Sequence, residues 1–151
     1  MESLEIGKGR FAVTSPRYAA LPKSTKILLV EDSNLQAKVL LKIFEELGYK
    51  NVLYCEHPEK ALETAKAEQS KVIFCDWNMP TMSGLDVLKL MRADEELKKV
   101  PFIFLTADSD RTKVIEAVKN GANDYIVKPA TAPTIDEKLR KAGGLEIPSS
   151  S

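Results

Sequence analysis

Residues 72–80, which read Val-Ile-Phe-Cys-Asp-Trp-Asn-Met-Pro, decide the fold of this chain. Apolar residues typical of a buried strand are followed directly by Asp76 and then by a loop that contains a proline. A strand that is buried on both faces of a parallel sheet needs such a solid apolar run. The stretch therefore predicts an interior strand that carries a carboxylate at its carboxyl end.

Four other apolar runs resemble this strand, and three of them also end in polar side chains. The polar groups are two further carboxylates, a hydroxyl and an amine. One strand that ends in a charge is ordinary, whereas several together indicate a single site. The run 26–30 is followed by Glu31 and Asp32, the run 101–105 by Thr106, and the run 124–127 by Lys128, while the run 52–55 completes the set.

Segments with apolar residues at helical spacing alternate with the five runs. Leu35 and Val39 belong to the apolar positions of the first segment, and Ile115 and Val118 to those of the fourth. The last segment has few apolar anchors, and we expect it to form a short, weak helix. The expected helices cover about 34–47, begin at Pro58, follow Ser83-Gly84, end at Gly121 and cover about 134–142.

Five strands that alternate with five helices predict an α/β fold, a doubly wound, flavodoxin-like parallel sheet with strand order 2-1-3-4-5. Ligands of such sheets bind beyond the carboxyl ends of the strands, where the strand order reverses. Glu31, Asp32 and Asp76 are therefore expected to converge between the first and third strands. Carboxylates this close repel one another unless a cation joins them, and Mg²⁺ suits carboxylate and phosphate oxygens. We expect a Mg²⁺ site at this edge.

The other polar groups favour phosphoryl transfer. A carboxylate can attack phosphorus and form an acyl phosphate, and Asp76 is the candidate nucleophile. Lys128 offers a compact positive charge for a phosphoryl oxygen, and Thr106 offers a hydroxyl donor. Chemistry of this kind depends mainly on positioning and on charge neutralisation.

Each of these residues, taken alone, has a simpler interpretation. Asp76 and Thr106 are typical turn or cap residues at a strand end, and Lys128 is a typical surface lysine. Glu31 and Asp32 are typical of a solvated turn, in which Asp32 or the next serine caps the first helix. The predicted strand order favours a functional site, because it brings all five residues to one edge of the sheet.

Composition agrees with one soluble domain. The chain has 151 residues, of which 44% are hydrophobic and 29% charged, and its net charge is zero. No run approaches the roughly 20 apolar residues that span a bilayer, and nothing indicates a nucleic-acid partner. We expect a cytoplasmic protein with a flexible arm at 1–25, one domain at 26–142 and a tail at 143–151. Cys55 and Cys75 are expected to be buried and too far apart for a disulfide.

The ordered set of motifs resembles the receiver domains of bacterial two-component response regulators, and most closely the single-domain, CheY-like chemotaxis type. The resemblance covers about 26–141 and rests on motifs at four strand ends. These are the acidic pair at 31–32, Asp-Trp-Asn-Met-Pro at 76–80 with Ser-Gly-Leu-Asp at 83–86, Leu-Thr-Ala at 105–107, and Lys-Pro at 128–129.

The resemblance implies a role for each matching residue. Asp76 is implied to be the phosphoacceptor and a Mg²⁺ ligand. Thr106 and Tyr125 are implied to move on activation, and Asn78 and Asp108 to tune the phosphate lifetime. Further implied roles are Mg²⁺ binding by Glu31, Asp32 and the backbone carbonyl of Asn78, phosphoryl contact by Lys128, and a cis bond between Lys128 and Pro129.

This chain departs from the family pattern at three places. Glu31 stands where aspartate is common, Ala130 stands where an aromatic residue is frequent, and the fifth helix and the tail that follows it are unusual. These differences concern the target of the protein rather than its phosphorylation chemistry.

The resemblance also implies partners and a mode of action. A histidine kinase of the chemotaxis type would phosphorylate the chain, a phosphatase would assist in removing the phosphate, and the target would be a protein such as a flagellar motor switch component. The surface of the fourth helix, the fifth strand and the fifth helix would bind that target. The protein would be a monomer that catalyses only its own phosphorylation and dephosphorylation.

Three alternatives stay open on the sequence. The first is a phosphorelay carrier that passes its phosphate to a histidine phosphotransfer protein. The second is an aspartyl-phosphate phosphatase, although the haloacid-dehalogenase type needs a second acid at position 78, where this chain has Asn78. The third is a binding scaffold that is never phosphorylated.

Overall fold

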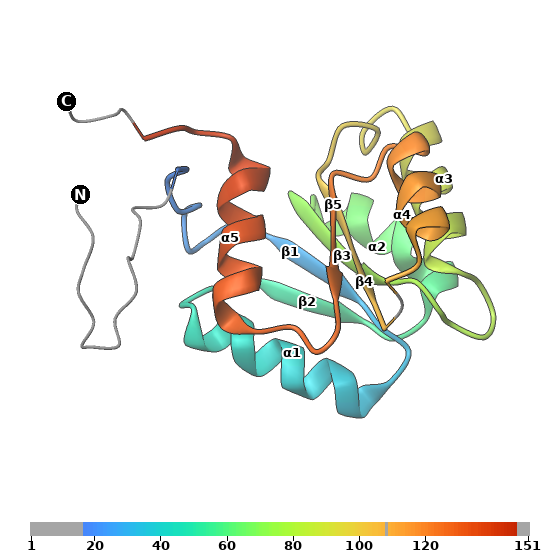
Figure 1. The fold of residues 1–151 in the computed structure, drawn as a ribbon, viewed down its shortest axis with the longest axis horizontal. Helices are drawn as coiled ribbons and strands as arrows, with labels where there is room; N and C mark the ends of the chain where they lie inside the picture. The colour runs from blue at the N-terminus through green and yellow to red at the C-terminus, as the bar shows by residue number, and fades with distance from the viewer. Residues whose placement is uncertain (1–16, 108, 148–151) are drawn as a thin grey trace.

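The computed structural model describes residues 17–107 and 109–147, and its centre is a parallel sheet between two layers of helices (Figure 1). The sheet order is β2-β1-β3-β4-β5, and every neighbouring pair is parallel. This confirms the predicted flavodoxin-like topology. The strands are β1 (Ile27–Val30), β2 (Val52–Cys55), β3 (Val72–Asp76), β4 (Phe102–Thr106) and β5 (Asp124–Val127).

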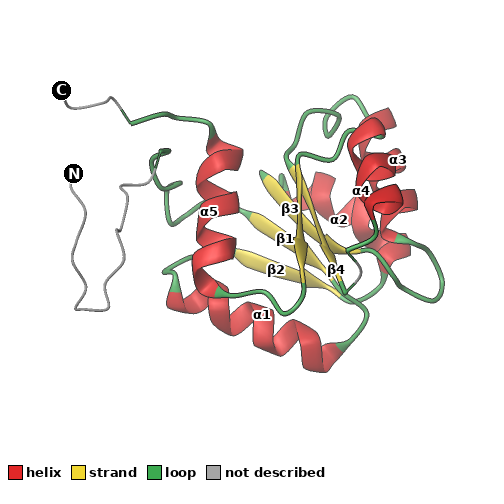
Figure 2. Cartoon of the chain, viewed as in Figure 1, coloured by secondary structure: helices red, strands yellow, loops and turns green. Residues whose placement is uncertain are grey.

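The helices divide between the two faces of the sheet (Figure 2). One face packs against α1 and α5, and the other packs against α2, α3 and α4. Each face has its own apolar core, and the sheet separates the two cores. The helices are α1 (Asn34–Glu46), α2 (Ala61–Glu68, after a 3₁₀ turn at Pro58–Lys60), α3 (Gly84–Ala93), α4 (Arg111–Lys119) and α5 (Ala132–Gly143).

The strands β1, β3 and β4 are buried along their whole length, as solid apolar runs require. On the α1 side, the ring of Phe44 meets the ring of Phe74 edge-on, with 5.1 Å between the ring centres. On the other side, Phe104 contacts Trp77, with 4.6 Å between the ring centres. Cys55 and Cys75 are buried and unpaired, as expected. Each is in register with Val30, because β1 lies between the strands β2 and β3 that carry them.

The prediction of a short fifth helix was wrong. Helix α5 has 12 residues and begins two residues before the predicted start. The side chain of Thr131 caps the helix by accepting a hydrogen bond from the backbone N–H of Thr134. Pro133 lies in the first turn, where a backbone N–H would have no partner within the helix, so the N–H that proline lacks is not missed. Ile135 and Leu139 are fully buried and anchor the helix to the sheet.

Some apolar residues at helical spacing point outward. The exposed fractions are 74% for Leu35 and 58% for Val39 on α1, and 49% for Ile115 and 62% for Val118 on α4. In α1 and α4 the buried face includes the small residues Ala37 and Ala117. Spacing alone identified these helices but did not identify the side that faces the core.

Residues 17–25 belong to the segment that we expected to be a flexible arm. In the structure they lie against the carboxyl-terminal end of α5 and beside the residues after it (Figure 1). The division of the chain at residues 25 and 142 stays a prediction. Within residues 17–107 and 109–147, none of the helices has the length and apolar character needed to cross a membrane.

Candidate functional site

Three carboxylates meet where the strand order reverses. Val30 is in register with Cys75, so the next residues along these two strands, Glu31 and Asp76, are neighbours. Asp32 follows directly, and one carboxylate oxygen from each of the three acids lies within 4.8 Å of the others. The convergence that the strand order predicted is therefore present.

The ammonium group of Lys128 lies beside two of these carboxylates. Its Nζ atom is 3.1 Å from Oε1 of Glu31 and 3.3 Å from Oδ1 of Asp76. It also donates a hydrogen bond to Oε1 of Gln36 on α1. The Lys128–Pro129 peptide bond is cis, as the resemblance implied.

Burial and negative charge act strongly on Glu31. This residue is fully buried, and its second carboxylate oxygen accepts a hydrogen bond of 3.2 Å from the backbone N–H of Ser33. Burial, assisted by the nearby charge of Asp76, raises the pKa of Glu31 to about 7, although Lys128 opposes the shift. Among the described residues, the three carboxylates thus face the ammonium of Lys128, and the remaining negative charge favours a cation.

The donor set fits magnesium. Mg²⁺ prefers carboxylate oxygens, binds through few of them and accepts phosphate oxygens at its other positions. Glu31, Asp32 and Asp76 are the groups that would hold it among the described residues. A bound dication would remove the repulsion among the three acids and would keep Glu31 ionised.

The start of α1 explains why Asp32 is available to a cation. The side chain of Ser33 caps this helix by accepting a hydrogen bond of 3.2 Å from the backbone N–H of Gln36. Of the two caps that the sequence left open, Ser33 is therefore the one used, and Asp32 is not needed for that role.

The loop after β3 is held by short backbone hydrogen bonds directly behind Asp76. The backbone N–H of Gly84 donates to the carbonyl of Trp77 at 2.8 Å, and the N–H of Trp77 donates to Leu105 on β4 at 3.0 Å. A Cβ atom at Gly84 would lie 2.2 Å from the backbone oxygen of Asp76. Only glycine permits this approach, so Gly84 positions Asp76.

Sequence reasoning gave no role to Gly84 or to Gln36. A signal for the first was present, since Ser83 and Asp86 form the capping box that starts α3 directly after the loop. No comparable signal existed for Gln36, because it lies inside a helix and not at a strand end.

The remaining predicted residues have these positions. Thr106 ends β4, is buried, and accepts a hydrogen bond of 2.7 Å at its carbonyl from the backbone N–H of Lys128. Tyr125 is half-buried on β5, in register with Phe104. Asn78 is exposed in the loop after β3. Asp108 lies outside the described residues, and its role stays a prediction.

Comparison with known proteins shows the family. Residues 27–140 match the response regulator receiver domain, and the chain belongs to this family. It is 42% identical over 123 residues to the chemotaxis protein CheY-3 of Vibrio cholerae, which covers 82% of this chain and 95% of that protein. It is 43% identical over 115 residues to the chemotaxis protein CheY1 of Helicobacter pylori, which covers 76% of this chain and 93% of that protein.

Solved structures agree with the family. The chemotaxis protein CheY4 of Vibrio cholerae superposes with a TM-score of 0.74 at 28% identity, over 79% of this chain and 98% of that chain. The receiver domain of a sensor histidine kinase from Pseudomonas aeruginosa superposes with a TM-score of 0.73 at 28% identity, over 80% of this chain and 98% of that chain. That structure holds a magnesium ion coordinated in its active-site cleft.

The class of the protein follows from these findings. The chain is a CheY-like, phospho-accepting receiver domain, which is a signalling protein and not a conventional enzyme. Its partner class is a histidine kinase. The aspartyl-phosphate phosphatase that the sequence left open has no support in this family.

Proposed function

We propose that the chain is a phosphorylation-driven switch of the chemotaxis type. Asp76 accepts a phosphoryl group from a histidine kinase, and Glu31, Asp32, Asp76 and the backbone carbonyl of Asn78 hold Mg²⁺. The convergence of the acids with Lys128 at the carboxyl edge of the sheet carries this proposal. The identity to chemotaxis proteins of Vibrio cholerae and Helicobacter pylori supports the biological setting.

The chemical step is a transfer of phosphorus from nitrogen to oxygen. A carboxylate oxygen of Asp76 forms a bond to phosphorus while the bond between phosphorus and the donor's imidazole nitrogen breaks, and the electron pair remains on that nitrogen. Lys128 neutralises charge on the phosphoryl oxygens and keeps Asp76 in position. Magnesium, when bound, supplies further charge neutralisation and orients the phosphoryl group.

The response to phosphorylation involves Thr106 and Tyr125. The new dianion attracts the Thr106 hydroxyl and the Lys128 ammonium, since both are donors at the same edge. Thr106 and Tyr125 border one small cavity between β4, β5 and α4, of about 10 Å³. A movement of Thr106 out of this space would leave room for the Tyr125 ring to turn inward.

The proposed target surface is formed by α4, β5 and α5. Ile115, Val118 and Val127 are large apolar residues exposed on α4 and β5, and exposed apolar surface of this kind favours a protein partner. A flagellar motor switch component is the target that chemotaxis relatives suggest. Asn78 and Asp108 would set the phosphate lifetime, alone or with a phosphatase.

We propose that the protein acts as a monomer in the cytoplasm. Cys55 and Cys75 are unpaired thiols, which agrees with a reducing compartment. A monomer keeps the target surface available, whereas a dimer through α4 and β5 would cover the exposed apolar residues.

Labelling with a small phosphodonor tests the proposal. Incubation with acetyl phosphate and Mg²⁺ should add one phosphoryl group by intact-mass spectrometry. Asp76→Asn should abolish the added mass. Asp94→Asn should keep it, because Asp94 lies at the end of α3, outside the acidic cluster, and pairs there with Lys66 of α2. Equal labelling of Asp76→Asn and the wild type would show that the assignment of the phosphoacceptor is wrong.

A phosphorelay carrier is the second candidate. The likeness to receiver domains of sensor histidine kinases, with TM-scores of 0.72 and 0.73, favours it, because these domains belong to kinases. The two functions differ in the direction of transfer. A carrier would lose its label quickly to an added histidine phosphotransfer protein, whereas a switch would keep it until hydrolysis.

A further inference from the structure

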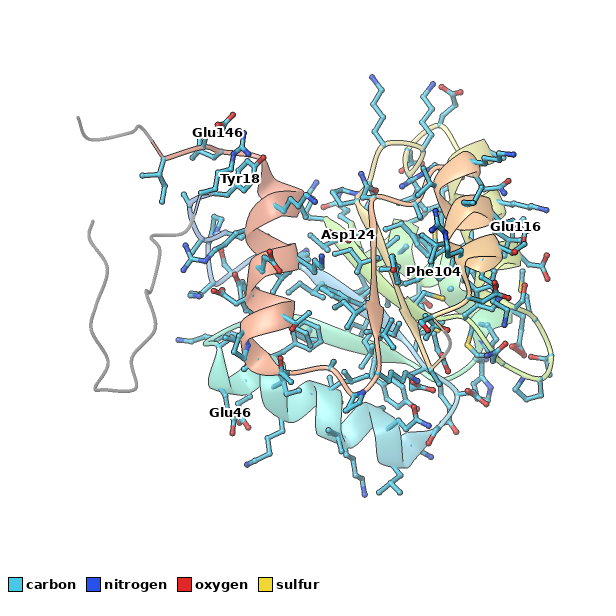
Figure 3. The ribbon with its side chains drawn as sticks, in the orientation of Figure 1. Tyr18, Glu46, Phe104, Glu116, Asp124 and Glu146 are labelled. Carbon is cyan, nitrogen blue, oxygen red and sulfur yellow. The ribbon has the colours of Figure 1, made fainter. Side chains whose placement is uncertain are left out.

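The family match covers residues 27–140. A short segment before this range and a short segment after it pair with each other. Tyr18 lies opposite Glu146 in an antiparallel bridge (Figure 3). The backbone N–H of Ala19 donates to Leu145 at 2.8 Å, and the N–H of Ile147 donates to Arg17 at 2.9 Å. We call residues 17–25 and 143–147 together the terminal clasp.

The clasp holds the carboxyl-terminal end of α5. The guanidinium of Arg140 donates a hydrogen bond of 3.1 Å to the carbonyl of Tyr18, while its Nε atom pairs with Asp136 at 2.9 Å. Leu21 packs against the apolar core beneath α1 and α5. A Cβ atom at Gly143 would lie 2.5 Å from the Leu21 side chain, which shows how closely the two segments approach.

The other end of the clasp is fixed to the turn between α1 and β2. The backbone N–H of Lys50 donates to the carbonyl of Lys23 at 3.2 Å, and the side-chain amide of Asn51 donates to Ser24 at 2.9 Å. The Lys23 ammonium stands 4.4 Å from the centre of the Tyr49 ring. The clasp therefore joins α5 to the rest of the domain at the amino edge of the sheet.

The helices on either side of β5 are held very differently. Besides the clasp, α5 has two fully buried anchors, Ile135 and Leu139, and an ion pair of 3.0 Å between Lys138 and Asp124 on β5. In α4 the buried residue is the small Ala117. Elements with little buried apolar surface open and shift most easily.

We propose that the terminal clasp restrains the switch: it keeps α5 in place, so that phosphorylation of Asp76 moves α4. The inference rests on the proposed function. As a consequence, the α5 part of the target surface has its final position before phosphorylation, whereas the α4 part changes position on phosphorylation. A clasp-free protein would respond with both helices.

Hydrogen exchange measured by mass spectrometry tests this restraint. The probe is beryllofluoride with Mg²⁺, which mimics the phosphoryl group on Asp76. In the wild type we expect exchange in 109–121 to change by about fivefold or more on activation, and exchange in 132–143 to change by less than about twofold. An equal response of both segments would overturn the proposal.

Variants of the clasp complete the test. Ala19→Pro removes the hydrogen bond to Leu145, and Leu21→Ala removes the packing against Gly143. The double variant should exchange about tenfold faster at the end of α5 and should respond there to beryllofluoride. Ala20→Pro, at an exposed neighbouring position that makes none of the clasp contacts described above, should behave as the wild type does.

The outcomes separate the clasp from the proposed function. Unchanged hydrogen exchange in β1 and β3 shows that a variant is folded. If the double variant exchanges faster in those strands, the single variant Ala19→Pro takes its place in the test. Wild-type exchange at the end of α5 in the folded clasp variant would overturn the proposal. If acetyl phosphate does not label Asp76 and beryllofluoride causes no response, the proposed function is wrong. If Asp76 is labelled normally but α5 of the wild type responds as α4 does, only the proposal for the clasp is wrong.

Discussion

The two edges of the sheet contrast in what they contain. At the carboxyl edge, Glu31 and Asp76 are buried next to each other, and Lys128 is the ammonium that contacts both. At the amino edge, the clasp combines backbone hydrogen bonds with the apolar side chain of Leu21 and with hydrogen bonds from the side chains of Arg140 and Asn51. Buried like charges cost stability, whereas paired backbone and buried apolar surface provide it.

The comparison teaches that the phosphoryl chemistry lies at the carboxyl edge, whereas the amino edge contributes to stability without taking part in that chemistry. An acidic cluster ready for a cation and a phosphoryl group is electrostatically unfavourable in its resting state. The rest of the domain must offset that cost, and the amino edge contributes to doing so without entering the chemistry. Changes at the two edges should therefore have separable effects on labelling and on stability.

The largest effect is expected for Gly84→Ala at the carboxyl edge. The added Cβ would meet the backbone oxygen of Asp76 at 2.2 Å, and neither backbone can yield easily. We expect a loss of about 3 kcal/mol in the free energy of unfolding by urea denaturation, with reduced labelling of Asp76.

Gly144→Ala is the matched control, because its backbone φ of 67° disfavours a side chain while no atom lies within 4 Å of the new Cβ. It should cost about 1 kcal/mol and leave labelling intact. Similar losses in the two variants would contradict the role of Gly84 in positioning Asp76.

Magnesium should remove much of the contrast between the edges. An ion that binds the native state alone raises the free energy of unfolding by about 2 kcal/mol at roughly 30 times its dissociation constant. Thermal melts with and without Mg²⁺ measure this gain. Asp32→Asn should reduce the shift, Asp94→Asn should not, and equal shifts in all three proteins would speak against the acidic cluster as the metal site.

At the amino edge, Leu21→Ala should lower stability without affecting the chemistry. Leu21 is partly buried, so we expect a loss of about 1.5 kcal/mol in urea denaturation, below the range for fully buried leucines. Labelling of Asp76 by acetyl phosphate should be unchanged. Leu145→Ala, at a residue that is 69% exposed, should cost less than about 0.5 kcal/mol. A loss of labelling in Leu21→Ala would break the separation of the two edges.

The last effect is the pH dependence that Glu31 causes. Its pKa is raised from 4.5 to about 7 in the folded protein, so between these values the folded state keeps a proton that the unfolded state has released. Without Mg²⁺, the contribution of Glu31 to stability therefore falls as the pH rises from about 4.5 through about 7.

The pH dependence is measured by urea unfolding at several pH values between 4.5 and 8. Glu31→Gln should lack this part of the slope, since it cannot ionise. With Mg²⁺ the gain in stability should grow over the same range, because the metal needs the ionised carboxylate. Identical slopes for the wild type and Glu31→Gln would show that Glu31 does not titrate in this range.

Most of the carboxyl edge was predictable from the chain itself. Apolar runs marked the strands, and the residue that follows each run had to lie at the same edge of a parallel sheet. The sequence alone therefore placed Glu31, Asp76 and Lys128 together. The reason is that strand direction and side-chain order follow local spacing, which the amino-acid sequence contains directly.

Tertiary structure alone decided the rest. No local pattern predicts that Val118 is exposed. No local pattern relates Lys128 to Gln36, or Tyr18 to Glu146, although the structure pairs them. Such contacts depend on how complete elements pack and on where both chain ends arrive. Spacing along the chain therefore determined the sheet and its chemical edge, whereas packing of the whole domain determined which helix faces stay open and how α5 is held.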